Sequence, residues 1–511
     1  MPIETELKLS IHSGDEARFP KLGLFKEYAC GRAKRRHLVG IYFDTPDLEL
    51  RRRRMVLRIR KESGRWIQAV KGPSRQQGGL HQRAEYEHAL AGRIPQPEYG
   101  LFVEHDHLDV FKDNNIIERL APRFRTDIWR TTWDLCLPNG SVIEAALDRG
   151  EIQTENHSVP VQELELELKR GMPETLYKIA QQVADSIHVR LEHTSKAQRG
   201  YDLLTNPKPK PQPVRSSEIR ISKSMTVEDV YAVILWNSVE QIHANEDAVL
   251  MNSDIEGVHQ MRVGLRRFRT CQHLFRKWVA DCVSTPLHAE LQTLSRYIGP
   301  ARDWDVFIND HLIPLFRDQA TIPGAEELRE CAISRRDTVY SELKRFVQSR
   351  EYHRILLDLA AWIACKKWRE AMDPALFEEF QFPAKNVARK MLSRGHKRIS
   401  KRGRHLVTLS ETDLHRLRIE IKRQRYTVEF LNSLFPGKRV QAYRKQLKGL
   451  QDQLGVLNDV VTAKRLLHEI DKNEDVPAVA YLLGWFKHIH IEELGSLEPS
   501  WKTLKRQAPT W

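Results

Sequence analysis

The sequence predicts an α+β protein, with a closed antiparallel β-sheet in its first half and an all-helical second half. Short runs that alternate polar and apolar residues, separated by turn signals, fill residues 1–205, and this period of two is typical of strands. Residues 206–217 (NPKPKPQPVRSS) contain four prolines, which favour an extended linker because proline removes backbone donors. Residues 218–511 show long helix-period patterns in which prolines are sparse.

The composition indicates a globular protein with a polyanionic partner. A chain of 511 residues exceeds one ordinary core and predicts two or three domains. Lys and Arg outnumber Asp and Glu by 82 to 68, for a net charge of +14. This excess favours nucleic acid, anionic lipid or a phosphate polymer, and charge alone does not choose among them.

The cysteines and the apolar runs favour a cytoplasmic protein without a membrane span. The six cysteines have neither CxxC spacing nor a closely paired framework, which predicts thiols that stay reduced. Charged Glu4, Glu6 and Lys8 occupy the place where a signal peptide needs an apolar segment. The most apolar internal run, LLDLAAWIAC, is shorter than the roughly 18 residues that span a bilayer.

Each predicted strand of the first half has one charged face. The opening IETELKL puts Glu4, Glu6 and Lys8 on one face and mainly apolar residues on the other. Helices are expected within 102–120 and 173–187, and Asn139–Gly140 predicts a hairpin. The charged face recurs in the following later runs: Arg58 and Arg60; Lys71; Arg83, Glu85 and Glu87; Glu144 and Asp148; and Glu163, Glu165, Glu167 and Lys169.

These faces predict a water-filled tunnel rather than an open sheet. If the apolar faces pack outward against helices, the charged faces converge inside a closed sheet, and burying so many charges without water would cost several kcal/mol per ion. The alternative is an open sheet with a solvated charged face, on which the two signs have no reason to segregate. Here Glu4, Glu6, Glu165 and Glu167 are acidic, whereas Arg58, Arg60 and Lys71 are basic.

The segregated charges point to metal-dependent phosphoanhydride hydrolysis. Carboxylates suit hard cations such as Mg²⁺ or Mn²⁺, and guanidinium and ammonium groups suit phosphate oxygens. The motifs IETELKL, LRIR, YFDTPD, IEAALDRGE, ELELELK and SKAQRGYDLL occur in this order within residues 1–205. Together they resemble the CYTH domain of the triphosphate tunnel metalloenzymes, which implies an eight-stranded antiparallel β-barrel tunnel that hydrolyses inorganic triphosphate.

The resemblance implies a role for each charged residue of the tunnel. Glu144 and Glu163 are expected to be supporting charges. The metal ligands are expected to be Glu4, Glu6, Glu165 and Glu167. The catalytic group, which positions the attacking water or a second metal, is expected to be Glu85, Glu87 and Asp148. The phosphate-binding residues are expected to be Lys8, Arg58, Arg60, Lys71, Arg83, Arg130 and Lys196.

An internal repeat organises the second half. HQMRVGLRRFR (259–269) recurs as HRLRIEIKRQR (415–425), and LSRYIGPARD (294–303) corresponds to LQDQLGVLND (450–459). His259 corresponds to His415 and Asp303 to Asp459, an offset of 156 residues in both cases. The constant offset predicts two copies of one helical bundle, at about 226–370 and 380–500, within a domain at 218–511.

Both copies carry a basic stripe on one helix. The alternative to an anion-binding site is a solvated basic face, or ion pairs with Asp303 and Asp459. The stripes are accompanied by no known nucleic-acid-binding motif and no series of exposed aromatic residues, which argues against a nucleic-acid partner. The duplicated HxxRVxxRR and HxxRIxxKR signatures resemble the CHAD domain, which implies binding of inorganic polyphosphate. The stripes contain His259, Arg262, Arg266 and Arg269 in the first copy and His415, Arg418, Lys422 and Arg425 in the second.

Taken together, the sequence predicts an inorganic triphosphatase that uses Mg²⁺ or Mn²⁺ and is joined to a polyphosphate-binding domain. One alternative is a class IV adenylate cyclase-like enzyme, against which we note that no adenine pocket is recognisable. Another is a non-catalytic polyphosphate-binding protein, which would gain nothing from so many carboxylates unless a metal bridges them to the phosphates.

Overall fold

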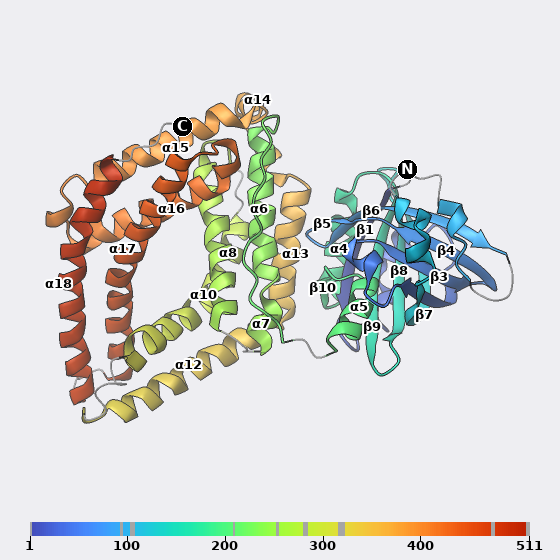
Figure 1. Ribbon diagram of the computed structural model, residues 1–511, viewed down its shortest axis with the longest axis horizontal. Helices are drawn as coiled ribbons and strands as arrows, with labels where there is room; N and C mark the ends of the chain where they lie inside the picture. Colours follow the sequence, from blue (N-terminus) through green and yellow to red (C-terminus); the bar gives the residue numbers. More distant parts are fainter. Residues whose placement is uncertain are drawn as a thin grey trace. The chain divides into compact units, whose positions relative to one another are not determined.

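The chain forms two compact units. The computed structural model describes residues 3–91, 96–102, 108–207, 210–251, 255–279, 285–314, 322–471, 476–506 and 511. The first unit comprises Met1–Lys210 and Ser349–Cys365, and the second comprises Pro211–Gln348 and Lys366–Trp511. The chain passes between the units three times: after Lys210 inside the proline-rich stretch, after Gln348 and after Cys365. Figure 1 shows the chain coloured along its sequence, with the residue numbers on the bar.

Eight strands of the first unit form a closed antiparallel ring. They pair in the order β1, β9, β8, β7, β2, β3, β4, β6, and pairing of β1 with β6 closes the ring. The eight-stranded barrel predicted from the sequence is therefore confirmed. The ring strands are β1 (Ile3–Ile11), β2 (Lys34–Asp44), β3 (Val56–Glu62), β4 (Arg65–Lys71), β6 (Leu80–Leu90), β7 (Ala121–Cys136), β8 (Val142–Gln153) and β9 (Ser158–Arg170).

Short elements cover the outside of the ring. Leu7, Leu9 and Leu166 are fully buried, and α4 (Glu174–Ser186) packs against β1 and β9, so the apolar faces point outward as predicted. Residues 102–120 form helical turns rather than one long helix, with 103–107 outside the described residues. The remaining elements are η1 (Phe19–Lys21), α1 (Gly23–Tyr28), α2 (Glu49–Arg52), β5 (Arg75–Gln77), η2 (Tyr99–Phe102), η3 (Asp109–Lys112), α3 (Asn114–Ile117) and β10 (Val189–Leu191).

Helix α5 (Lys196–Thr205) closes one end of the ring. Ser195 caps the helix by accepting a hydrogen bond from the backbone N–H of Gln198, and Tyr201 packs edge-to-face on Phe124, with ring centroids 5.1 Å apart. Gly200 allows this approach, because a Cβ there would lie 2.2 Å from the Phe124 ring. The helix therefore fills the end of the ring with apolar side chains.

A disulfide corrects one prediction. Cys30 and Cys136 are bonded, with Cα atoms 5.9 Å apart, so the expectation that all thiols stay reduced is wrong for this pair. Residues 106 apart in the sequence meet because the chain after α1 runs along the end of β7, where the Cys30 backbone N–H donates to the Asp134 carbonyl at 2.8 Å. Cys282 lies outside the described residues.

One helix from the second half of the sequence belongs to the first unit. Helix α13 (Arg350–Ala364) packs on α4 and β10. The Arg350 guanidinium donates to the Ala184 carbonyl at 2.6 Å, and His188 Nε2 lies 2.7 Å from His353 Nδ1. Contacts across more than 160 residues therefore complete the first unit.

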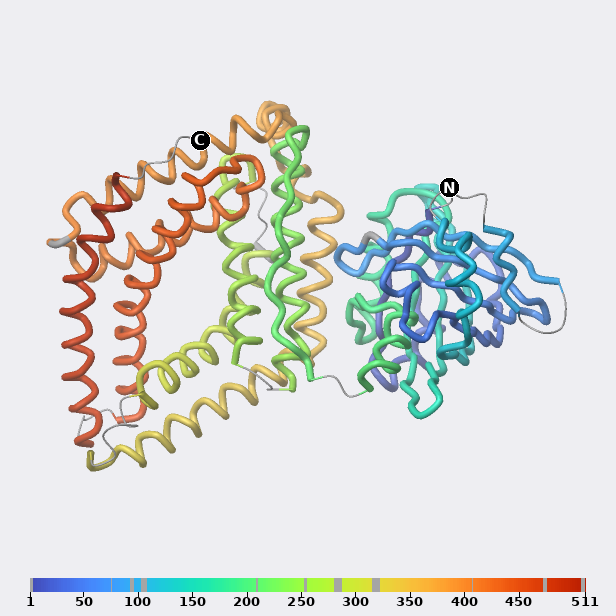
Figure 2. Tube along the Cα trace, viewed as in Figure 1, coloured from blue at the N-terminus to red at the C-terminus, as the bar shows by residue number. Residues whose placement is uncertain are grey.

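The second unit is helical, as predicted, and α17 and α18 run side by side in the Cα trace (Figure 2). Within the described ranges, no helix combines the length and apolar character needed to cross a bilayer. The helices are α6 (Val227–His243), α7 (Glu246–Met251), α8 (Ile255–Leu274), α9 (Arg276–Val279), α10 (Thr285–Val306), the π-helical η5 (Phe307–Leu312), α12 (Ala325–Val347), η6 (Lys367–Arg369), α14 (Pro374–Phe380), α15 (Ala384–Arg402), η7 (Leu406–Thr408), α16 (Glu411–Leu431), η8 (Asn432–Leu434), α17 (Lys438–Ile470) and α18 (Pro477–Arg506).

The repeat places corresponding helices together. The stripe helices of the two copies are α8 and α16, and the Gly- and Asp-containing segments lie on α10 and α17. Arg267 on α8 pairs with Glu429 on α16, and its guanidinium lies 4.9 Å from the Phe430 ring centroid. The second unit therefore brings both basic stripes into one neighbourhood.

Candidate functional site

The ring encloses a charged cavity of about 380 Å³. Every one of the eight ring strands contributes side chains to its lining, because alternate residues of each strand point inward. Strand direction distinguishes the two ends: α5 packs against Tyr42 and Phe124 at one end, and the β3–β4 and β7–β8 turns lie at the other. We call the first the closed end and the second the open end.

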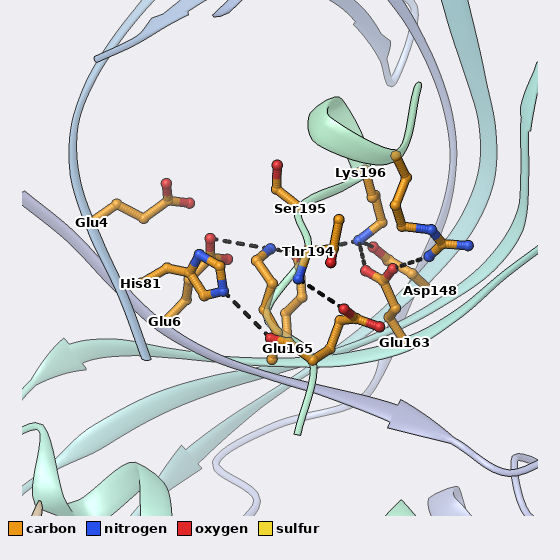
Figure 3. Close-up of polar contacts among 12 residues, drawn as sticks. Glu4, Glu6, His81, Asp148, Glu163, Glu165, Thr194, Ser195 and Lys196 are labelled. Atoms are coloured by element: carbon orange, nitrogen blue, oxygen red, sulfur yellow. Dashed lines mark hydrogen bonds and ion pairs between the residues drawn. The ribbon is translucent and has the colours of Figure 1, made fainter. Parts of the chain in front are cut away.

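Lys196 is the centre of a buried network at the closed end. Its ammonium group lies 2.9 Å from Asp148 Oδ2 and donates to Glu163 at 2.6 Å and Glu165 at 2.9 Å (Figure 3). The Arg130 guanidinium binds both oxygens of Asp148, at 2.7 and 2.6 Å. The Asp148 and Glu163 side chains are each 1% exposed, so these ions depend on one another for solvation.

The charges of this network are stabilised by their partners. Burial would raise the pKa of Asp148, but Arg130 and Lys196 outweigh burial and hold that pKa below its ordinary value. Burial would lower the pKa of Lys196, but Asp148, Glu163 and Glu165 raise it well above its ordinary value. Acid and base therefore both remain charged near neutral pH.

A second network lies toward the middle of the tunnel, on β1, β4 and β6. The Lys71 ammonium contacts Glu4 at 3.0 Å and Glu85 at 2.8 Å, and Arg83 bridges Glu4 at 2.9 Å and Glu6 at 3.0 Å. Burial raises the pKa of Glu85, and the nearby Glu4 adds to this effect against Lys71. Glu85 is thus a predicted catalytic carboxylate whose raised pKa makes it accept a proton more readily than an ordinary glutamate.

Two guanidinium groups have spare hydrogen-bonding capacity. Arg58 approaches Glu85 and Glu87 only to 3.5 Å. Arg60 pairs with Glu62 through Nη2 at 2.9 Å and lies 3.7 Å from Glu87. Among the described residues, the Nε atoms of Arg58 and Arg60 are buried without a hydrogen-bond partner. A buried donor without a partner is costly, so these two groups are prepared to receive an anion.

Three carboxylates face one another near the open end. Burial raises the pKa of Glu167, Lys169 lowers it, and the charges of Glu4 and Glu144 raise it further. Repulsion of this kind is relieved by a cation, and an all-oxygen donor set suits Mg²⁺ or Mn²⁺. Across the described part of the chain, no three His, Cys, Asp or Glu side chains converge tightly enough to form a ready metal cage, because Glu4, Glu6 and Glu165 are turned toward Lys and Arg.

The second unit has a cavity of about 330 Å³ between α8, α10, α16 and α17. Both copies contribute to it, with Arg262 and Arg266 from the first and Arg418 and Lys422 from the second. Arg262 donates to Asp303 Oδ1 at 2.7 Å, and Arg418 lies 3.6 Å from Asp459. The ion pairs expected as the alternative are therefore present, yet they do not neutralise the cavity.

The excess positive charge of this cavity affects the pKa values of its lining residues. Burial, together with Arg418 and Arg266, lowers the pKa of Lys422 to about 6. Burial and Arg302 lower the pKa of His259 to about 4. Like charges held close together without enough counter-ions destabilise the charged forms, and a bound polyanion would reverse this.

The other predicted stripe residues lie outside this cavity. The Arg269 guanidinium donates to the Leu291 carbonyl at 2.9 Å, and Arg425 donates to Gln451 at 2.6 Å. His415 lines an adjacent cavity of about 280 Å³ and contacts Asn458 at 2.9 Å. Of the eight predicted residues, His259, Arg262, Arg266, Arg418 and Lys422 share one cavity.

Comparison with known proteins matches both units. Residues 2–201 match the family described as the CYTH domain, and residues 233–468 match the CHAD domain. The chain contains a CYTH domain followed by a CHAD domain. An inorganic triphosphatase from Haemophilus influenzae is 30% identical over 198 residues, which are 39% of this chain and 54% of that protein. The crystal structure of the CHAD domain from the plant Ricinus communis aligns with a TM-score of 0.50 and 28% identity, over 57% of this chain and 96% of that one.

The CYTH domain brings the predicted tunnel residues together. Asp148 lies just behind the lining, held by Arg130 and Lys196. Sequence reasoning missed Arg36 and Glu62, which also line the cavity. Arg36 sits in the basic run KRRH, where alternation is hidden, and Glu62 begins the turn signal ESG. Of the two predicted supporting charges, Glu144 lines the cavity, whereas Glu163 lies behind the lining and binds Lys196. The lining contains the other predicted metal-binding, catalytic and phosphate-binding residues, namely Glu4, Glu6, Lys8, Arg58, Arg60, Lys71, Arg83, Glu85, Glu87, Arg130, Glu165, Glu167 and Lys196.

Proposed function

We propose that the CYTH domain hydrolyses inorganic triphosphate to diphosphate and phosphate, with Mg²⁺ or Mn²⁺. The observation that supports this most strongly is the tunnel itself, in which acidic and basic side chains from all eight ring strands face one cavity. The 30% identity to the Haemophilus influenzae inorganic triphosphatase supports the same substrate, and the chain spans 54% of the length of that protein. A cytoplasmic location remains part of this proposal.

The basic residues of the tunnel would hold the phosphate chain. Arg58 and Arg60 offer free Nε–H donors. The other basic side chains exchange part of their carboxylate contacts for phosphate oxygens; they are Lys8, Lys71, Arg83, Arg130 and Lys196. Charge-assisted hydrogen bonds of this kind orient the substrate and stabilise the charge that develops during phosphoryl transfer.

The carboxylates divide into two roles in this proposal. Glu4, Glu6, Glu165 and Glu167 would hold the metal, which when bound neutralises phosphate charge and lowers the pKa of a water molecule. Glu85, with its raised pKa, accepts the proton from the attacking water at its carboxylate oxygen, and Glu87 assists by holding Arg58. Asp148 stays ionised and fixes Arg130 and Lys196.

The test is phosphate release from triphosphate, with and without a chelator, by the full chain. We expect the double substitution Glu4→Gln, Glu6→Gln to reduce the rate by about a hundredfold or more, and the exposed control Glu118→Gln to leave it unchanged. ATP serves as a parallel substrate, and cyclic AMP formation would favour the cyclase instead. Wild-type hydrolysis by the double variant would refute the metal assignment.

We propose that the CHAD domain binds inorganic polyphosphate in the cavity shared by its two copies. The support is the convergence of basic side chains from both copies on one cavity, where burial together with Arg418 and Arg266 lowers the pKa of Lys422. A linear polyanion would pair with Arg262, Arg266 and Arg418 and restore the charge of Lys422. Binding of long-chain polyphosphate should weaken about tenfold in Arg266→Gln, whereas Lys390→Gln on the exposed face of α15 should change it little.

A further inference from the structure

Three side chains of the tunnel lining form a cluster toward the open end, and we call Arg36, Glu62 and Arg60 the mouth triad. Glu62 accepts from Arg36 through one carboxylate oxygen and lies 2.9 Å from Arg60 Nη2 through the other. β2 and β3 run side by side, and both residues approach the end marked by the β3–β4 turn. One carboxylate therefore holds two guanidinium groups at the entrance.

Glu62 is firmly ionised. Burial would raise its pKa, but Arg60, Arg36 and Arg130 outweigh burial and hold that pKa below its ordinary value. The nearest cations are thus three arginines from β2, β3 and β7. Glu62 occupies the position that a phosphate group would take among these guanidinium groups, and it acts as an internal substitute for one.

The mouth triad is more accessible to solvent than the network at the closed end. The Arg36 side chain is 42% exposed and Glu62 is 15% exposed, whereas Asp148 and Glu163 at the closed end are 1% exposed. Exposed ion pairs contribute little free energy and exchange partners readily, whereas buried pairs are costly to break. An entering anion therefore displaces Glu62 more easily than it displaces Asp148 or Glu163.

The nature of the phosphate at the entrance decides whether this displacement succeeds. Lys196 lines the cavity at the closed end, and Arg36 and Arg60 line it toward the open end, so a phosphate chain that binds Lys196 extends toward these two arginines. A terminal phosphate carries up to about two charges near neutral pH and presents three oxygens. An esterified phosphate carries one charge and presents fewer free oxygens, so it competes less well with a carboxylate that already binds both arginines.

We propose that Glu62 is a specificity-determining residue that makes the tunnel favour inorganic triphosphate over esterified triphosphates such as nucleotides. The carboxylate is a displaceable counter-ion, which a free terminal phosphate replaces on Arg36 and Arg60 and an esterified phosphate replaces poorly. This proposal rests on the proposed triphosphatase function, and it assigns the selection of the substrate class to a residue outside the predicted catalytic and metal-binding sets.

The experiment compares inorganic triphosphate with ATP, by kcat/KM for hydrolysis and by Kd from calorimetry, both with the full chain. We expect wild type to prefer triphosphate, and Glu62→Gln to reduce this preference about tenfold, the value of one charge-assisted contact, chiefly through tighter ATP binding. Arg36→Gln should weaken triphosphate binding and abolish the effect of a second Glu62→Gln change. Glu118→Gln, an exposed carboxylate away from the lining, should leave the preference intact.

The two readouts separate the failure of this proposal from the failure of the proposed function. If the wild-type chain binds triphosphate but hydrolyses neither compound, the triphosphatase assignment fails, and the ratio of Kd values still tests Glu62. An unchanged Kd ratio in Glu62→Gln, or an additive effect in the double variant, would overturn the role of Glu62. Circular dichroism of each variant establishes that the barrel is folded.

Discussion

Polyphosphate binding by the CHAD domain should depend on pH through one lysine. Burial and the neighbouring Arg418 and Arg266 lower the pKa of Lys422 to about 6, so its amine is largely neutral at physiological pH in the ligand-free protein. A polyanion in the cavity favours the ammonium form and raises this pKa. Binding therefore takes up a proton, and affinity must fall as pH rises above the ligand-free value.

The size of this effect follows from linkage. If the bound polyanion returns the pKa of Lys422 toward its ordinary value near 10.5, Kd rises tenfold for each pH unit between the two values, or roughly fiftyfold between about pH 6 and about pH 8. At about pH 8 nearly one proton is taken up per occupied cavity. His259, with a pKa of about 4, is neutral before binding over the same range.

The assay is isothermal titration calorimetry of the full chain with long-chain polyphosphate, at several pH values and in two buffers that differ in ionisation enthalpy. The Lys422→Arg substitution keeps the charge but does not titrate in this range, so it should flatten the pH dependence and remove most of the proton uptake. Lys390→Gln is the matched surface control. A Kd that is independent of pH in wild type, or a slope retained in Lys422→Arg, would refute the reasoning.

Three further predictions concern the first unit and its folding. Asp148→Asn leaves Arg130 and Lys196 short of a buried counter-ion, and should lower the free energy of unfolding by about 3–5 kcal/mol in urea titrations. Because the native pKa of Asp148 is lowered, the contribution of this carboxylate to wild-type stability should be present above its unfolded-state pKa and be lost as pH falls through its native pKa. A destabilisation by Asp148→Asn that persists unchanged in acid would contradict this. Gly200→Ala should destabilise the barrel by about 1–3 kcal/mol, since the new Cβ meets the Phe124 ring, and an unchanged melting temperature would show that α5 moves freely. Cys30→Ser should reduce the unfolding free energy by about 2–4 kcal/mol, and if a reductant affects wild type and this variant equally, the disulfide does not form in solution.

Much of the barrel could be predicted because local patterns repeat along each strand. Side chains alternate regardless of the partner strand, so the sides of Glu4, Glu6 and Lys8 were predictable from IETELKL alone. The hairpin at Asn139–Gly140 was predictable because tight turns need a positive φ, which glycine adopts without strain. Gly140 indeed has φ 80°. Neither inference needs any knowledge of distant contacts.

The missed residues depend on distant contacts. Glu62 is the last residue of β3 and precedes a turn, so its sequence neighbours do not reveal that Arg36 from another strand binds it. Cys30 and Cys136 become adjacent only when the segment after α1 hydrogen-bonds to the end of β7. Helix α13 has an ordinary amphipathic pattern, and only its contacts with α4 and β10 place it in the first unit.

The stripes of the CHAD domain show the same division. Helical spacing predicted which residues share a face, and the constant offset predicted two copies. Spacing on one helix does not determine what the face meets, so only the packing of α8, α10, α16 and α17 decided that Lys422 and Arg266 share a cavity while Arg269 and Arg425 bind elsewhere.

By itself, the sequence determined which side of each strand and helix is charged, because backbone periodicity is a local property. It also determined the order of the two domains and the charge chemistry of each. Only the tertiary structure decided which charges neutralise one another and which remain available to a ligand. That outcome depends on distances between residues far apart in the chain, and the energy of an ion pair falls with distance and with exposure to water.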